Sequence, residues 1–154
     1  MTSSSIFALD LGTTTGYCYN LLSETYSGVH NFKPKRQEGG GMRYVRFEKW
    51  LEKSLDISSP DFVYFEEVRA HNGVNAAHIY GGFMSSVLRI CEGRGIPHSG
   101  VPVGTIKKHI SGKGNASKQL VKQTVEMTFG RKPCDDNEAD AMAIWHYAAK
   151  VLHP

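Results

Sequence analysis

Four carboxylates stand at positions from which they can meet and bind a cation. Asp10 and Glu66 each end a short apolar run, and Asp136 and Asp140 are four residues apart, a spacing that puts them on one face of a helix. Two carboxylates about 4 Å apart repel by on the order of 4 kcal/mol at an effective dielectric of about 20. Such a cluster stays ionised only when a cation lies among its members.

The composition of this candidate ligand set selects the kind of metal. It offers carboxylate oxygens and contains no Cys or His pair, which favours Mg²⁺ over zinc and allows Mn²⁺ as a substitute. Two such ions roughly 3.5 to 4 Å apart can activate a water molecule and stabilise the departing oxygen in phosphodiester hydrolysis. This ligand set therefore suits metal-dependent hydrolysis of a phosphodiester.

Asp10, Glu66 and Asp136 also have simpler explanations. Asp10 can hydrogen-bond the backbone of the Gly-Thr turn that follows it. Glu66 and Glu67 can form a surface pair at the end of their strand, and only one of them can point to the same face of the sheet as Asp10. Asp136 can serve as a helix N-cap, a role for which Asp135 competes.

The elements that must position these groups alternate between strands and helices. Apolar and β-branched runs predict a buried strand at 6–10, two further strands that form an antiparallel meander with it, and strands before Glu66 and at 96–103. Helical periodicity appears at 44–55, 75–92, 105–110, after an N-cap at Ser117, and after Asp135 or Asp136. This order predicts an α/β protein whose sheet has mixed strand directions.

Two details of the helices carry expectations of their own. Asp140 is followed by Ala-Met-Ala-Ile-Trp, which places a charge on the helix face that packs against the sheet, where it needs a partner. Gly81 and Gly82 lie inside the helix at 75–92, and close packing against the sheet would explain them.

Length and composition limit the classes of protein to which this chain can belong. With 154 residues and 40% hydrophobic content, the chain predicts a single domain spanning 1–154 rather than a disordered protein. There is neither a membrane-spanning run nor a secretion signal, so we expect a cytoplasmic protein. Cys18, Cys91 and Cys134 are odd in number and widely spaced, which predicts buried free thiols.

The charge distribution favours a polyanionic partner. The net charge is only +3, but basic residues crowd the stretches 33–53 and 107–122, while acidic residues gather at 135–140. Basic flanks around an acidic spot suit a polyanion that must be brought to metal-binding carboxylates.

Four segments in this order resemble the RuvC-type Holliday-junction resolvases of the RNase H-like nuclease superfamily. They are ALDLGTTTGY, VYFEEVRAHNGVNAAHIYGG, VPVGTIKKHISGKGNASKQLV and DDNEADAMAIWH. The resemblance implies an RNase H-like fold, with a central mixed five-stranded sheet flanked by helices. It implies that Asp10, Glu66 and Asp140 are metal ligands and that Lys107 and Lys118 meet the scissile or adjacent phosphate.

The fourth ligand departs from the common pattern of the family. Many members place Asp or His three residues before the last Asp, where this chain has Asn137; others use a spacing of four, which selects Asp136. We favour Asp136, because a carboxylate binds a hard dication better than an amide does.

The resemblance also implies a substrate. Resolvases of this type cut branched DNA by paired symmetric nicks that leave 5′-phosphate and 3′-hydroxyl ends, and they act as homodimers without a nucleotide cofactor. Where many carry an aromatic wedge after the catalytic Glu, this chain has Arg69, followed by His71 and Asn72. We expect these three residues, with Lys107, Lys113 and Lys118, to contact DNA.

Three alternatives stay open at this stage. The first is a related exonuclease or another branched-DNA nuclease. The second is an actin-like ATP-binding domain, since LDLGTTTGY also resembles the first phosphate-binding hairpin of that class; however, such proteins hold ATP between two domains. The third is a nucleic-acid-binding module without activity, whose acids only cap helices.

Overall fold

The protein is built on one five-stranded sheet. The computed structural model describes residues 3–154. Its strands lie in the order β3-β2-β1-β4-β5, with β2 antiparallel to β1 and β3, and with β4 parallel to β1 and β5. Their bounds are β1 (Ile6–Asp10), β2 (Thr14–Leu21), β3 (Glu24–Asn31), β4 (Phe62–Glu67) and β5 (His98–Pro102). The predicted mixed five-stranded sheet is confirmed.

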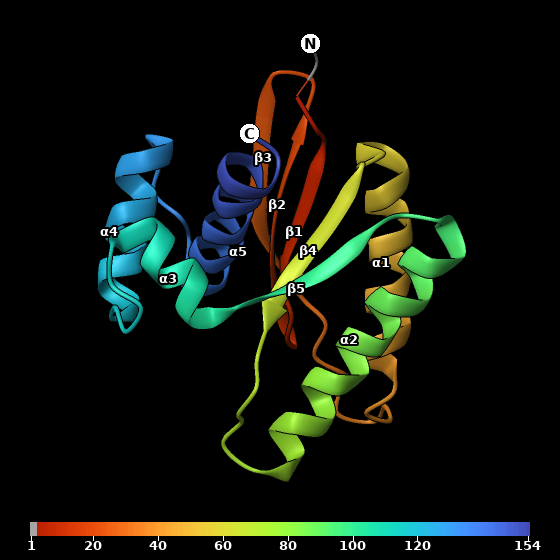
Figure 1. Ribbon diagram of the computed structural model, residues 1–154. Helices are drawn as coiled ribbons and strands as arrows, with labels where there is room; N and C mark the ends of the chain where they lie inside the picture. Colours follow the sequence, from red (N-terminus) through yellow and green to blue (C-terminus); the bar gives the residue numbers. More distant parts are fainter. Residues whose placement is uncertain (1–2) are drawn as a thin grey trace.

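Helices cover both faces of this sheet (Figure 1). Two of them, α1 (Met42–Ser58) and α2 (Val74–Arg94), lie on one side, and the other three lie on the opposite side. The second group consists of α3 (Val103–Ser111), α4 (Lys118–Phe129) and α5 (Asp136–Tyr147), and a short π-helix (Ala148–Leu152) extends α5. The predicted helices are all present, with ends that differ by a few residues.

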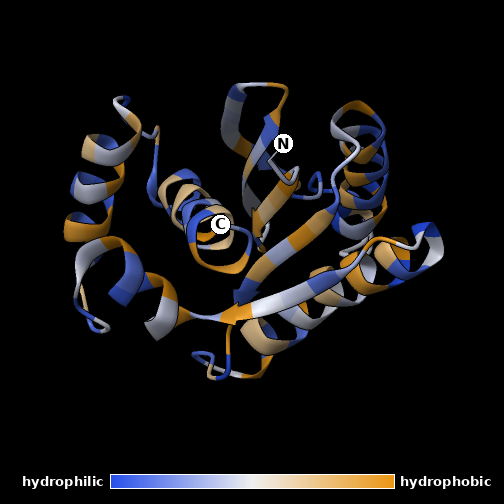
Figure 2. Cartoon of the chain, turned by 45° about the horizontal axis from the view of Figure 1, so that its top comes forward, coloured by the Kyte–Doolittle hydropathy of each residue, from blue (hydrophilic) through white to orange (hydrophobic). Residues whose placement is uncertain are grey.

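Strand β1 is apolar on both faces because each face packs against helices. Ile6 and Ala8 belong to the core beneath α5, whereas Phe7 and Leu9 belong to the core beneath α1 and α2. This is the pattern of a central strand, whose side chains alternate between two buried layers. Figure 2 shows the hydrophobic residues on the central strands and on the helix sides that face them.

Local capping fixes where the last two helices begin. The Ser117 hydroxyl accepts a hydrogen bond from the Leu120 N–H at 3.1 Å, as predicted for the start of α4. Of the two candidate caps for α5, Asp135 is the one used: its carboxylate accepts from the Glu138 N–H at 2.9 Å. Asp136 is therefore the first residue of α5, and its side chain is not needed for capping.

Two expectations about the core are wrong. Cys18 and Cys91 are buried, but Cys134 is exposed, because it lies in the loop between α4 and α5. The glycines of α2 do not approach the sheet. A Cβ at Gly82 would lie 2.4 Å from the Tyr44 ring on α1, and a Cβ at Gly81 would meet nothing within 4 Å. Gly82 thus permits close contact between two helices.

Candidate active site

Three carboxylates from distant parts of the chain converge at one edge of the sheet. Strands β1 and β4 are parallel neighbours paired from Ile6–Phe62 to Leu9–Phe65, so the next residue on each strand is Asp10 or Glu66. Asp140 comes from α5, which packs across β1 and β2. One oxygen from each of the three side chains lies within 4.8 Å of the others.

Close contact between α5 and β2 brings Asp140 to this position. Gly16 of β2 faces the first turn of α5, where a Cβ would lie 1.9 Å from the Asn137 carbonyl oxygen and 3.1 Å from the Glu138 nitrogen. Any side chain at residue 16 would therefore force the helix away from the sheet. The absence of a Cβ at Gly16 sets the distance between α5 and the strands that carry the other two acids.

A buried glutamate fixes the same end of α5. The Glu138 carboxylate accepts hydrogen bonds from the Ser27 hydroxyl of β3 at 2.6 Å and from the Cys134 N–H at 2.7 Å. Glu138 is only 8% exposed, and these bonds satisfy a charge that would otherwise be costly to bury. Because Glu138 is two residues from Asp140, it helps to hold the helix turn that presents the third acid.

The pKa values of the three acids reflect burial and mutual repulsion. Burial raises the pKa of Asp10 well above its usual range, and the charges of Asp140 and Glu66 raise it further. The pKa of Asp140 is raised to about 7, first by burial and then by the charges of Glu66 and Asp136. Burial also raises the pKa of Glu66. At neutral pH the negative charges of these carboxylates are not balanced by nearby positive charges.

The donor set fits a hard divalent cation. The three groups offer only oxygen atoms, they are close enough to share one ion, and their raised pKa values show that the anionic forms lack compensation. A bound cation would reverse these shifts, since an opposite charge within about 4–6 Å favours the ionised form.

The structure does not bring the fourth predicted ligand into this cluster. The carboxylate of Asp136 lies 3.6 Å from the Lys122 ammonium on α4, and its side chain is 42% exposed. Asn137 does not replace it, because its amide donates to the Asp135 carboxylate at 3.2 Å. Asp136 is nevertheless near enough for its charge to raise the pKa of Asp140.

The two predicted lysines lie beside the acids. Positive charge on Lys107 of α3 and on Lys118 at the start of α4 lowers the pKa of Glu66 and of Asp140, which opposes the effect of burial. Lys113 is exposed in the loop between α3 and α4. Basic side chains therefore border the cluster on its α3–α4 side.

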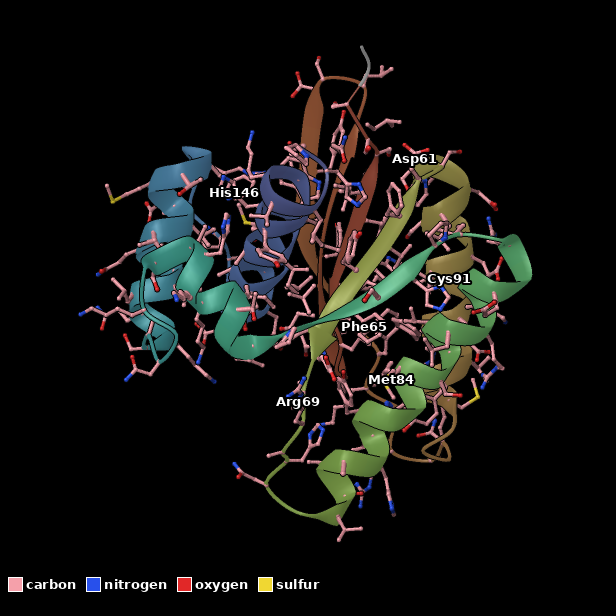
Figure 3. The ribbon with its side chains drawn as sticks, viewed as in Figure 1. Asp61, Phe65, Arg69, Met84, Cys91 and His146 are labelled. Atoms are coloured by element: carbon pink, nitrogen blue, oxygen red, sulfur yellow. The ribbon has the colours of Figure 1, made fainter. Side chains whose placement is uncertain are left out.

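The predicted DNA-contacting residues 69, 71 and 72 lie on the segment between β4 and α2. Figure 3 shows Arg69 below the end of β4, and its guanidinium Nε lies 3.5 Å from the Glu67 carboxylate. The His71 ring packs against Tyr80 with centroids 5.0 Å apart. A cavity of about 370 Å³ is lined by Asp10, Glu66, His71 and Tyr80 together with apolar side chains. Asn72 is exposed.

Sequence reasoning missed three residues that shape this site. Glu138 follows Asp135 by three residues, which is the spacing of a capping box and could have marked it. Gly16 closes the motif GTTTG, but its close approach to α5 depends on how strand and helix pack. Tyr80 was assigned only to a helix face, and nothing local indicates that its hydroxyl reaches β4.

Comparison with known proteins gives the site a context. No family model matches the chain. The chain is 32% identical over 111 residues to the crossover junction endodeoxyribonuclease RuvC of Streptomyces griseus, covering 69% of this chain and 54% of that protein. It is 28% identical over 152 residues to the RuvC of Chlamydia abortus, covering 92% of each. The chain is thus similar in sequence to crossover junction endodeoxyribonucleases of the RuvC type.

The fold agrees with that of a solved RuvC. The structure of T. thermophilus RuvC in complex with a Holliday junction substrate superposes with a TM-score of 0.77 at 23% identity, covering 92% of this chain and 90% of that one. The fold is thus the RNase H-like fold of RuvC. The chain spans about half the length of the Streptomyces RuvC and nearly all of the Chlamydia RuvC.

None of the helices within residues 3–154 has the length and apolar character needed to span a bilayer.

Proposed function

We propose that this protein is a metal-dependent, structure-selective endodeoxyribonuclease that cuts four-way DNA junctions. The observation that carries this proposal is the convergence of Asp10, Glu66 and Asp140 from two parallel strands and the helix that packs across the sheet. The crossover-junction activity in the names of the RuvC relatives supports the choice of substrate.

The residues of the site divide the work of phosphodiester hydrolysis. Asp10, Glu66 and Asp140 would hold Mg²⁺, for which Mn²⁺ can substitute; a bound ion of this kind supplies Lewis acidity and an activated water. Lys107 and Lys118 neutralise the negative charge that develops on the phosphate. The products are 5′-phosphate and 3′-hydroxyl ends. Asp136 would be the fourth ligand; its partly exposed carboxylate pairs with Lys122 in this structure.

Recognition of the junction falls to the segment between β4 and α2 and to the basic loop between α3 and α4. Arg69, His71 and Asn72 contact the branch point, and Lys113 contacts an adjacent phosphate. A four-way junction has two equivalent strands to cut, so a homodimer with two-fold symmetry matches its substrate. Sedimentation measurement of the mass in solution tests this assembly.

The activity is tested with three labelled DNAs and two conditions. A four-way junction, a linear duplex and single strands are incubated with the protein in Mg²⁺ or in EDTA. The proposal expects paired symmetric nicks in the junction only, and only with Mg²⁺. Trimming of free ends would instead identify a related exonuclease, and ATP hydrolysis without DNA cleavage would overturn the nuclease proposal.

Replacement of single acids separates catalysis from binding. Asp10→Asn and Asp140→Asn are expected to lower the cleavage rate by at least about a thousandfold, while junction affinity in EDTA stays the same or rises, because each variant removes negative charge near the phosphates. Asp56→Asn is the control, since Asp56 lies on α1 and pairs with Arg94. Near wild-type cleavage by Asp10→Asn would contradict the assignment.

A further inference from the structure

Strand β4 loses one of its two neighbours where it carries Glu66. The pairing of β4 with β1 ends at Phe65, one residue before Glu66. On the other side, Glu66 is still paired with Val101 of β5, and Glu67 is paired with Pro102, the last residue of β5, which has no N–H to donate. At Glu66 the backbone is therefore held on one side only, by β5, and support on the other side has to come from elsewhere in the fold.

A single side chain from α2 supplies this support. The Tyr80 hydroxyl donates a hydrogen bond to the Glu66 carbonyl oxygen at 2.6 Å and accepts one from the Val68 N–H at 3.3 Å. Both polar functions of the hydroxyl are thus used on the backbone on either side of Glu67. Tyr80 is only 8% exposed, and its ring lines the cavity beside Asp10 and Glu66.

We propose that Tyr80 is a positioning residue that holds Glu66 in place for metal binding and ties it to the DNA-contacting segment 69–72. Because the hydroxyl bridges Glu66 at the end of β4 and Val68, the residue that precedes that segment, it fixes the backbone from which the Glu66 side chain extends. His71 packs on the same ring, so the tyrosine links the acidic cluster to the neighbouring loop. This inference rests on the proposed function for its DNA-dependent consequences only.

The chain provides a matched control for the loss of a tyrosine hydroxyl. Tyr80→Phe removes the two hydrogen bonds and keeps the buried ring, so the fold is retained. Tyr64→Phe makes the same chemical change on β4 itself, two residues before Glu66, where the hydroxyl instead bonds to His153 Nε2 at 2.7 Å. Thermal unfolding of both variants checks that each is folded.

Three measurements test the role of Tyr80. They are Mn²⁺ binding to the DNA-free protein by calorimetry, junction affinity in EDTA by fluorescence anisotropy, and the single-turnover cleavage rate of bound junction as a function of Mg²⁺. For Tyr80→Phe we expect Mn²⁺ affinity and the rate at limiting Mg²⁺ to fall about tenfold, with junction affinity within about twofold of wild type and most of the rate recovered at saturating Mg²⁺. Tyr64→Phe should match wild type in all three.

The outcomes distinguish the two proposals. Wild-type Mn²⁺ affinity in Tyr80→Phe, or equal losses in both variants, would overturn the positioning role. A tenfold loss of Mn²⁺ affinity in Tyr80→Phe alone supports this role even if the wild-type protein cuts no DNA, a result that would instead remove the proposed function.

Discussion

At the scale of single residues, each acid of the cluster is unfavourable for the others until a cation lies between them. The sequence predicted Asp10, Glu66 and Asp140 because each has a charge directly beside an apolar run, which is unusual without a reason. It could not predict that the Asp136 carboxylate pairs with Lys122, because that contact depends on how α4 packs against α5. The type of a residue and its local spacing indicate that burying its charge costs free energy. They do not indicate which side chain or ion offsets that cost.

Removal of the Asp140 charge should stabilise the metal-free protein at high pH. The folded pKa of about 7 exceeds the ordinary value of 3.8, so between these values the folded protein binds more protons than the unfolded chain, and stability falls as pH rises through that interval. In EDTA at pH 8, Asp140→Asn is therefore expected to raise the melting temperature by about 5 °C, corresponding to about 2 kcal/mol for a chain of this length.

The pH dependence of this difference is the decisive part of that prediction. At pH 5 the wild-type Asp140 is already protonated in the folded state, so the advantage of Asp140→Asn should shrink. Asp56→Asn removes an exposed carboxylate that pairs with Arg94 and should give no such gain at pH 8. Differential scanning calorimetry at both pH values measures the effect, and a gain that did not change with pH would contradict it.

At the scale of secondary-structure elements, the sequence predicted which segments are strands and which are helices better than it predicted how they meet. The strand at Ile6–Asp10 and the start of α4 follow from apolar periodicity and a capping serine. The order β3-β2-β1-β4-β5 and the contact of α5 with β2 do not, because they are set by packing between segments far apart in the chain. Gly16 is the clearest case, since its importance appears only when α5 lies on it.

A methyl group at residue 16 should disturb the site through α5. In Gly16→Ala, the contact of 1.9 Å with the Asn137 carbonyl forces the first turn of α5 outward, and we expect a loss of about 1–3 kcal/mol of stability with a weakened affinity for Mn²⁺. Gly93→Ala is the control, because Gly93 lies in α2 with nothing within 4 Å of the added Cβ, and it should gain up to about 1 kcal/mol. Urea denaturation and calorimetric titration measure both, and unchanged metal affinity in Gly16→Ala would refute the role of this contact.

At the scale of the whole molecule, the two faces of the sheet differ in what they offer to DNA. The face covered by α3, α4 and α5 carries the acid cluster and the lysines beside it, whereas the acids of α1 pair with the arginines of α2 on the other side. The net charge of +3 does not reveal this difference. Only in the folded chain are the charges that pair between α1 and α2 separated in space from the lysines near the acid cluster.

The salt dependence of junction binding should show which face of the molecule contacts the DNA. Lys113→Gln is expected to reduce the slope of log affinity against log salt concentration by about 1, the effect of losing one phosphate contact. Lys53→Gln changes an equally exposed lysine on α1 and should leave the slope unchanged. Anisotropy titrations in EDTA at several salt concentrations give both slopes; an equal reduction in the two variants would mean that DNA wraps both faces.

The acid cluster also has a consequence for biosynthesis. Its ligands come from β1, β4 and α5, so a ribosome-bound polypeptide that has not yet released residues 136–147 holds two of the three acids and lacks the helix that completes the set. The proposed nuclease activity would therefore arise only after α5 has been synthesised and has packed against β1 and β2.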